Sequence, residues 1–246
     1  MRIKGEPLDM RAELGRLTSK RGLLFLLLFV AASLIAYRMN FSAVLGTESQ
    51  SFTLFQFFGP VAGAFLGPFV GAGIVLITEI LNFALLGSTL TLFGVLRFST
   101  LMFAAVYFGG SMRNARLAAV VPLLCMALFI LHPVGSGAAI YTLYWLIPAI
   151  ALIFPNNLLL KSFGATFTAH AIGSTLFLYS FPSTASFWLG LIPVVAFERT
   201  MFALGIAASF IALQFVLAKL EHVLPQGVVR LNQRYSLFDF NGAVKA

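Results

Sequence analysis

The residues of this 246-residue sequence that could do chemistry are a few polar side chains inside long apolar runs. An ionisable side chain at membrane depth is costly, so it usually pairs with another group or serves a function. Such side chains can bind a polar solute through charge and hydrogen bonds, or they can relay protons and ions. The sequence therefore predicts a substrate-binding group that consists of Glu79, Asn82, Arg97, His170, Glu198 and Arg199.

Some members of this group have a second interpretation. Glu79 and Arg97 fall in neighbouring apolar runs, so they could equally form a buried ion pair that only neutralises both charges. His170 has Thr166 and Ser174 at i−4 and i+4, which places a polar stripe on one helix face. This histidine could contact a ligand, or it could only pack against a neighbouring helix.

Glu198 and Arg199 are adjacent in the chain. Successive residues of an α-helix point about 100° apart, so these two side chains are not expected to address the same partner directly. At least one of them should meet another helix.

Aromatic residues gather in two further places within the apolar runs. An interfacial belt is the preferred interpretation of both groups, and stacking on a ligand is the alternative. The two groups contain Tyr141, Tyr144, Trp145, Phe187 and Trp188.

The composition shows what kind of elements must hold these residues. Hydrophobic residues make up 60% of the chain and charged residues only 10%, and the mean hydropathy is +0.96. This composition excludes an ordinary soluble enzyme and predicts a multi-pass protein of the cell membrane. The net charge of +8 falls mainly beside the apolar runs, where basic residues set membrane orientation, so no nucleic-acid partner is expected.

Up to eight apolar runs can serve as membrane helices. Several have about 16 residues and reach only about 24 Å, less than the roughly 30 Å hydrocarbon core, so the number of crossings is six or eight. Gly67 and Pro68 offer a turn that divides one 35-residue stretch into two runs. The runs cover residues 22–37, 53–66, 69–87, 92–109, 117–132, 138–153, 164–181 and 187–218.

Basic residues fix the orientation of these runs. With a turn at Gly67, six N-terminal cations, the cations at 113, 116 and 161 and those of the tail share the cytoplasmic side, while the outer loops hold only Arg38. The predicted fold class is an all-α, polytopic transmembrane bundle of six to eight spans with both termini cytoplasmic. Residues 1–21 form a basic cytoplasmic segment, 22–218 the bundle and 219–246 a cytoplasmic tail.

This orientation places the substrate-binding group at one depth. Counted at 1.5 Å per residue from the outer ends of their helices, all its members fall in the outer half of the membrane. We therefore expect a small polar pocket that opens to the outside.

A glycine ladder with a spacing of four precedes and follows the predicted turn. Small residues at this spacing let helix backbones approach closely, and close packing alone is sufficient to explain them. The alternative is that the glycines line a cavity or a moving contact surface. The ladder contains Gly59, Gly63, Gly67 and Gly71.

Motifs for catalysis and ATP hydrolysis are missing from the sequence. It contains no HExxH-like metal set, no P-loop and no Gly-x-Ser-x-Gly elbow. We therefore expect neither an enzyme nor a resident metal or cofactor, and no ATPase activity of its own.

The sequence resembles the substrate-binding (S) components of energy-coupling factor (ECF) transporters. The run at 57–83 is similar to that family's passage from the second to the third helix, with a Leu-Gly-Pro-x-x-Gly turn at Leu66, Gly67, Pro68 and Gly71. The segments at 93–110, 167–174 and 191–199 are also similar in character.

The resemblance implies a function and a set of partners. S components are small proteins, mostly of six helices, that bind a vitamin or other micronutrient with high affinity near the extracellular face. A separate transmembrane coupling protein and ATPase subunits supply the energy for uptake. Such proteins meet the coupling protein through an Ala-x-x-x-Ala surface, which Ala32 and Ala36 match, and we expect the glycine ladder to extend this partner interface. The family's binding site is capped by the loop that here covers about 38–52.

Two other functions stay open on the sequence. The first is a self-sufficient secondary transporter or channel in which Glu79 or Glu198 relays protons or ions. The second is a membrane scaffold, or a membrane enzyme of a new kind, whose buried charges are structural or catalytic.

Overall fold

Nearly all of the residues that the computed structural model describes are helical. They are residues 10–15, 20–43, 51–86, 91–113, 115–219, 229, 231–232 and 235. Most of the predicted N-terminal segment 1–21 and of the tail 219–246, including both chain ends, lies outside the described residues.

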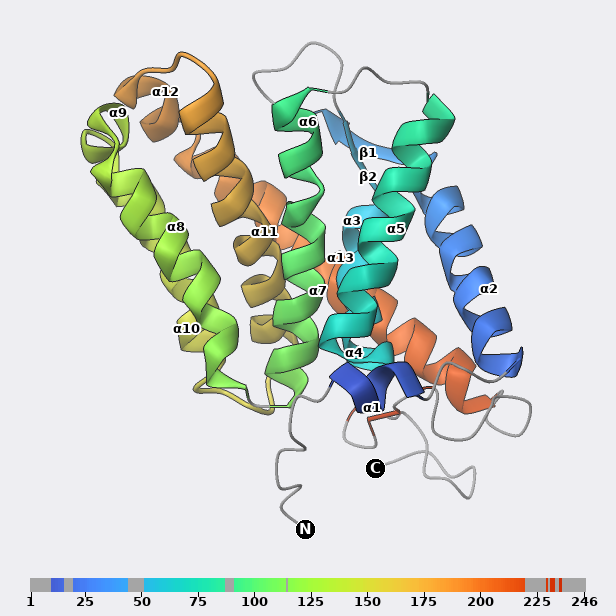
Figure 1. The fold of residues 1–246 in the computed structure, drawn as a ribbon. Helices are drawn as coiled ribbons and strands as arrows, with labels where there is room; N and C mark the ends of the chain where they lie inside the picture. Colours follow the sequence, from blue (N-terminus) through green and yellow to red (C-terminus); the bar gives the residue numbers. More distant parts are fainter. Residues whose placement is uncertain are drawn as a thin grey trace.

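The first half of the chain folds into helices interrupted by one hairpin (Figure 1). Its elements are α1 Met10–Gly15, α2 Lys20–Tyr37, β1 Asn40–Ala43, β2 Ser51–Thr53, α3 Phe55–Phe58, the 3-10 helix η1 Gly59–Val61, α4 Ala62–Leu66, α5 Pro68–Leu86, α6 Leu92–Arg97 and α7 Ser99–Met112. Those of the second half are η2 Arg116–Ala119, α8 Val120–Leu131, α9 Pro133–Ser136, η3 Ala139–Leu146, α10 Ile147–Ala151, α11 Leu158–Ser180, α12 Ala185–Gly190 and α13 Ile192–Lys219.

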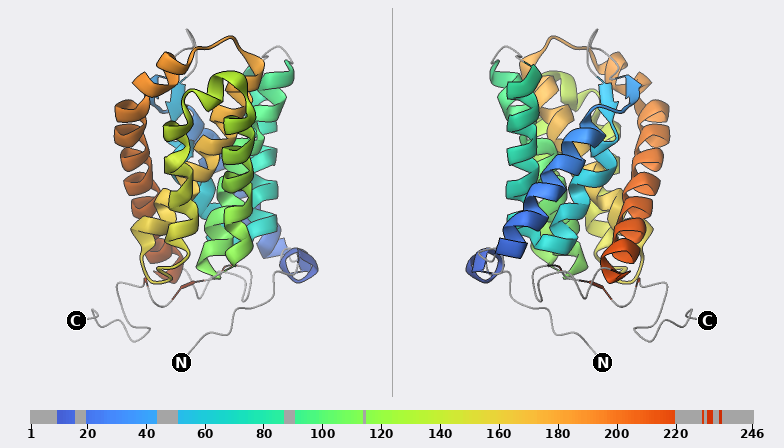
Figure 2. Two further views of the ribbon diagram at one scale, coloured as in Figure 1. Left: turned by 90° about the vertical axis from the view of Figure 1, so that its left-hand side faces the viewer. Right: turned by 90° about the vertical axis from the view of Figure 1, so that its right-hand side faces the viewer.

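Helices α7 and α11 form the centre of the bundle. Helix α7 packs against α5 and α11, and α11 packs in turn against α8, α10 and α13. The β1–β2 hairpin, α6, α9 and α12 lie at one end of the bundle, which we call the hairpin end, and α1 lies at the other (Figures 1 and 2).

Three helices are long and apolar enough to cross a membrane. They are α5, the joined α6 and α7 over Leu92–Met112, and α13. Large apolar side chains stand on the outside of the bundle, as lipid contact requires, and four of the most exposed are Leu85, Leu92, Leu131 and Phe197. The total number of crossings and the sides of the two termini stay predictions.

Helix α11 is the longest helix after α13, and it is unusually polar. Most of its residues are buried, including Lys161, Thr166, Thr168 and Ser174. A helix surrounded by other helices can carry polar side chains, because it presents little surface to lipid.

The predicted turn at Gly67 is confirmed. Helix α4 ends at Leu66, Gly67 has a φ of 106°, and α5 begins at Pro68. A positive φ of this size suits glycine, which has no Cβ, and the fixed φ of proline suits the first residue of a helix. The stretch 53–87 is therefore not one continuous helix.

The glycine ladder lies in contacts between helices of this chain, which corrects its assignment to a partner interface. Gly59, Gly63, Gly67 and Gly71 are all buried. A Cβ added to Gly63 would overlap the carbonyl oxygen of Ala105, and one added to Gly71 would lie 2.6 Å from the Cα of Gly63. The ladder thus lets the backbones of α4, α5 and α7 touch one another.

The second part of the predicted partner interface lies on α2. Ala32 is exposed, and Ala36 is partly buried against the apolar core that α2 shares with α5. Of the residues predicted to meet a partner, only these two therefore have surface on the outside of the described structure.

A small antiparallel hairpin departs from the predicted all-α class. Strand β1 pairs with β2, with Asn40 opposite Thr53 and Ala43 opposite Ser51. Pairing the two strands satisfies backbone groups that an irregular connection would leave open at the end of the bundle. The hairpin falls within the 38–52 loop, whose residues 44–50 lie outside the described residues.

The aromatic residues near the hairpin end form an internal cluster, so the interfacial-belt interpretation is wrong for three of them. Tyr141, Trp145 and Trp188 are each at most 2% exposed. The two tryptophans pack edge-on against Phe129, with centroids 5.2 Å away for Trp145 and 5.0 Å away for Trp188, and Tyr141 stacks on the same ring. Edge-to-face contact of this kind favours burial of the rings together over separate contact with lipid headgroups.

Candidate functional site

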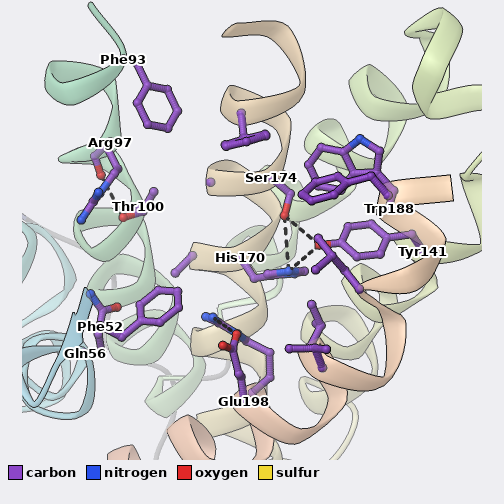
Figure 3. A pocket seen from close by; sticks show the side chains of 18 residues that line it. Phe52, Gln56, Phe93, Arg97, Thr100, Tyr141, His170, Ser174, Trp188 and Glu198 are labelled. Carbon is purple, nitrogen blue, oxygen red and sulfur yellow. Dashed lines mark hydrogen bonds and ion pairs between the residues drawn. The ribbon is translucent and has the colours of Figure 1, made fainter. Parts of the chain in front are cut away.

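A cavity of about 170 Å³ lies between helices that are distant in sequence. Its walls come from β2, α3, α6, the start of α7, η3, α11, α12 and α13 (Figure 3). Its polar lining residues are Gln56, Arg97, Thr100, Tyr141, His170, Ser174, Glu198 and Arg199. Its larger apolar lining residues are Phe52, Phe93, Phe177, Phe187, Trp188, Leu191, Val194 and Val195.

The structure brings four of the six predicted substrate-binding residues together. Arg97 comes from α6, His170 from α11, and Glu198 with Arg199 from α13, and all four line the cavity. Figure 3 shows Arg97 on the wall opposite Tyr141 and Trp188. Residues from three helices far apart in the chain thus meet around one space.

Glu79 and Asn82 are not part of the described lining, which corrects their place in the predicted group. Both are buried on α5. The hydroxyl of Tyr37 on α2 donates to Glu79 Oε2 at 2.6 Å, so this carboxylate is held at the contact between α2 and α5. The side-chain oxygen of Asn82 is buried without a hydrogen-bond partner within the described structure.

His170 is fixed by three side chains, which decide where its proton lies. Trp145 Nε1 lies 3.1 Å from His170 Nδ1, and Tyr141 Oη lies 2.8 Å from His170 Nε2. An indole N–H can only donate, so Nδ1 must accept and the ring proton belongs on Nε2. His170 is therefore neutral in this arrangement, because a charged ring would point an N–H at the indole.

The hydrogen bonds of His170 continue through Tyr141 and Ser174 to the cavity. Since His170 Nε2 donates to Tyr141, the hydroxyl of Tyr141 is left to donate to Ser174 Oγ, 3.2 Å away. Ser174 Oγ also lies 3.3 Å from His170 Nε2 and lines the cavity. The hydrogen of the Ser174 hydroxyl is then free to donate to a bound solute (Figure 3).

Arg199 is a buried cation with weak pairing. Its Nη2 lies 3.4 Å from Glu198 Oε2 and its Nη1 donates to Thr166 Oγ1 at 3.4 Å, while its buried Nε has no hydrogen-bond partner among the described residues. The guanidinium carbon lies 4.4 Å from the ring centre of Phe202 and 5.0 Å from that of Phe52. Aromatic faces stabilise a guanidinium by cation–π contact, but they satisfy none of its N–H groups.

The contact between Glu198 and Arg199 was not predicted, and the contact of Arg199 with α11 agrees with the expectation that one of the two meets another helix. The two side chains do contact each other, because a long arginine side chain can bend around the 100° between neighbouring helix positions. Arg199 also meets another helix, since Thr166 belongs to α11. Of the polar stripe on α11, Thr166 therefore binds the arginine, while His170 and Ser174 line the cavity.

Several lining residues were not predicted from the sequence. Phe52 arrives from the hairpin and packs edge-on against Phe202 with ring centres 5.0 Å apart. Gln56 and Thr100 lie at the ends of their helices and carry no charge, so nothing in the sequence marks them. Tyr141 and Trp188 belong to the two aromatic groups, and the signal for them was present but favoured a membrane interface.

Comparison with protein-family models, with curated proteins and with solved structures finds no match to this chain. The site is therefore argued from its own geometry. Within the described residues, no three His, Cys, Asp or Glu side chains come together as a metal site. The arrangement can hold a small solute by charge, by hydrogen bonds and by aromatic contact.

Proposed function

We propose that this protein captures a small polar micronutrient within the membrane, with high affinity, for uptake that a separate ATP-hydrolysing module drives. The observation that carries this proposal is the cavity, around which charged and polar groups from three distant helices converge. Ionisable groups inside a membrane protein are costly, so a group of them around an open space favours a binding site over a structural one.

The position of the cavity supports capture from outside the cell. The walls of the cavity include residues of β2, α6 and α12, elements that lie at the hairpin end of the bundle, opposite α1 (Figure 1). The positive-inside rule and the basic residues of the N-terminal segment and of the tail support a cytoplasmic position for the α1 end. The cavity would then lie in the outer half of the membrane, where a binding protein meets its substrate first.

The resemblance to S components of ECF transporters supplies the proposed energy source. Such a protein needs a transmembrane coupling protein and ATPase subunits as partners. The exposed Ala32 on α2 is where we propose that the coupling protein docks, with Ala36 at the edge of the contact. The buried glycine ladder would hold the helices beneath that surface in place.

A second candidate is a self-sufficient secondary transporter, and Glu198 is the observation that favours it. Its carboxylate lines the cavity beside Arg199, where proton binding could alter the ion pair. In this alternative Glu198 would couple solute movement to a proton or ion gradient, with no partner subunit.

Two measurements on the full-length protein separate these functions. The first is mass spectrometry of small molecules released from the purified protein in detergent, and we expect one solute per chain. The second is solute uptake by the protein alone in liposomes under a proton or sodium gradient, and we expect none. Uptake driven by the gradient would instead establish the secondary transporter.

A substitution in the cavity ties the retained solute to this site. We expect the variant Arg97→Ala to lose the co-purified solute while it keeps the elution volume and melting temperature of a folded protein. Arg38→Ala is the matched control, because Arg38 is exposed beside the hairpin and does not belong to the described lining. Full retention in Arg97→Ala would remove the cavity from the proposed function.

A further inference from the structure

Cations outnumber carboxylates in the described lining of the cavity. The lining contains two guanidinium groups, Arg97 and Arg199, and one carboxylate, Glu198. His170 contributes no charge, because the indole N–H of Trp145 holds its Nδ1 as an acceptor. The buried carboxylate of Glu79 lies outside the lining, where it accepts the hydroxyl of Tyr37 and also attracts Arg97 electrostatically. The pairing of Arg199 therefore decides whether the lining can take up an anion.

Arg199 has unused capacity to bind an anion. It is 4% exposed, and its one carboxylate contact is a single N···O approach of 3.4 Å to Glu198. Guanidinium–carboxylate pairs that are fully formed use two parallel hydrogen bonds of about 2.7–2.9 Å. Among the described residues, the buried Nε–H of Arg199 has no partner, and an unsatisfied buried donor is costly. The guanidinium group is thus weakly satisfied as a whole, and a carboxylate in the cavity that it lines would add acceptors for it.

The remaining walls indicate what the rest of the ligand is like. Phe93, Phe177 and Trp188 from three different helices all line the cavity, and Phe93 and Trp188 lie on the side away from Glu198 (Figure 3). Phe177 and Trp188 are packed edge-on with centroids 5.9 Å apart, so the wall is preformed. Such rings favour an apolar or aromatic body, while the hydroxyl of Ser174 can donate one hydrogen bond.

From these observations we infer that the cavity binds a small monocarboxylate with an apolar, ring-sized body, whose carboxylate contacts Arg199 and Arg97. This inference rests on the proposed function, and it names the chemical class of the captured solute. A carboxylate on the ligand would complete the pairing of Arg199, which Glu198 contacts only at 3.4 Å. A positively charged ligand would instead be repelled by both guanidinium groups.

Glu198 has a distinct role in this arrangement. Its side chain is 15% exposed and contacts Arg199, so it competes with the ligand for the same guanidinium. Removing the negative charge while keeping the shape of the side chain should therefore strengthen the binding of an anion. A carboxylate that served only to hold Arg199 in place would give the opposite result.

The experiment compares three probes of nearly one shape and different charge. Benzoate, benzamide and benzylamine are titrated calorimetrically into the full-length protein in detergent after co-purified solute has been removed. We expect benzoate to bind at least about tenfold more tightly than benzamide, and benzylamine to bind most weakly. Binding of benzamide or benzylamine as tight as that of benzoate, or no binding of any probe, would overturn the inference.

Isosteric variants supply the second readout. We expect Glu198→Gln to tighten benzoate binding by about threefold to tenfold, and Arg199→Lys to weaken it by about tenfold because an ammonium cannot bind a carboxylate in a bidentate way. Arg38→Lys is the matched control, since it makes the same change at an exposed arginine outside the described lining, and it should leave benzoate affinity unchanged. If Arg199→Lys does not fold, the benzoate affinity of Glu198→Gln still tests the inference. Benzoate binding by Glu198→Gln that is equal to or weaker than that of the natural protein would contradict it.

Failure of this inference and failure of the proposed function give different results. A neutral or cationic solute retained one-to-one by the purified protein would overturn the monocarboxylate while leaving capture intact. Uptake by the protein alone along an ion gradient would overturn the partner-driven function while leaving the preference for benzoate intact.

Discussion

Two regions of the bundle differ in how closely their helices pack. Where α4, α5 and α7 meet, glycines bring backbones into direct contact, and not even one added carbon fits at Gly63 or Gly71. Where α6, α11, α12 and α13 meet, the helices stand apart around a cavity of about 170 Å³. The two regions share α7, whose first turn contributes Thr100 to the cavity and whose later part contacts Gly63 through Ala105.

The difference shows how an apolar bundle can keep a polar cavity open. In a membrane, helices associate mainly by close packing and by hydrogen bonds, because lipid is as apolar as the side chains. Close backbone contact on one side fixes α5 and α7, so the other side of the bundle does not need to fill its space with side chains. The predictions that follow test this division, from the largest expected effect to the smallest.

The largest effect is expected where an added carbon would meet backbone. Gly71→Ala should lower the free energy of unfolding by about 3 kcal/mol, because its Cβ would lie 2.5 Å from the nitrogen of Gly63 and neither helix can yield cheaply. The measurement is thermal unfolding of the full-length protein in detergent, together with its yield after size-exclusion chromatography.

Gly73→Ala is the matched control in the same helix. Nothing lies within 4 Å of a Cβ added at Gly73, so alanine should be neutral or should stabilise α5 by up to about 1 kcal/mol. Equal melting temperatures for the two variants would mean that the glycine contact does not hold the bundle together.

A second, smaller effect is expected at the wall of the cavity. Trp145→Phe should cost about 2 kcal/mol of stability, because it removes the N–H that His170 Nδ1 accepts and leaves a small void. Trp188→Phe should cost less, since the partner of its indole is the partly exposed Ser183.

The same pair of variants also locates the ligand. The chain has two tryptophans, of which Trp188 lines the cavity, whereas Trp145 is not part of the described lining and contacts Tyr141. A change in tryptophan fluorescence on addition of benzoate should therefore persist in Trp145→Phe and disappear in Trp188→Phe. The reverse pattern would place the solute outside this cavity.

Some of the fold could be predicted from the sequence because single residues decide it. Gly67 and Pro68 specify the turn between α4 and α5 by backbone conformation alone, which needs no knowledge of the neighbours. The direction in which the glycine ladder faces could not be predicted. A spacing of four indicates a contact surface, but an intramolecular helix and a partner protein fit that surface equally well.

The candidate site was predictable to a similar extent. Arg97, His170, Glu198 and Arg199 stood out because charged or titratable groups are rare in apolar runs. Glu79 stood out for the same reason and lies elsewhere, because the sequence does not show that Tyr37 on another helix provides its hydrogen bond. Depth in the membrane was read from residue counts, whereas the side of the helix that faces the cavity depends on tertiary packing.

The hydrogen bond between Tyr37 and Glu79 tests whether Glu79, unlike Glu198, lies outside the binding site. Tyr37→Phe should lower stability by about 1 kcal/mol, since the carboxylate loses the hydroxyl that donates to it at 2.6 Å. Benzoate affinity should not change, because the described lining contains neither residue. A clear loss of benzoate affinity in a folded Tyr37→Phe protein would return Glu79 to the binding site and would remove the contrast with Glu198.

The smallest effect is expected within the glycine ladder itself, at Gly59. A Cβ there would lie 3.2 Å from the tip of the Phe55 ring, and its three nearest neighbours are all ring atoms of that side chain rather than backbone. The ring can shift by a few tenths of an ångström, and alanine favours helical backbone over glycine by up to about 1 kcal/mol. These two contributions oppose each other, so Gly59→Ala should stay within about 0.5 kcal/mol of the natural protein in thermal unfolding. If Gly59→Ala proved as damaging as Gly71→Ala, the ladder would act as one rigid surface, and the distinction between contact with backbone and contact with a movable ring would not explain its packing.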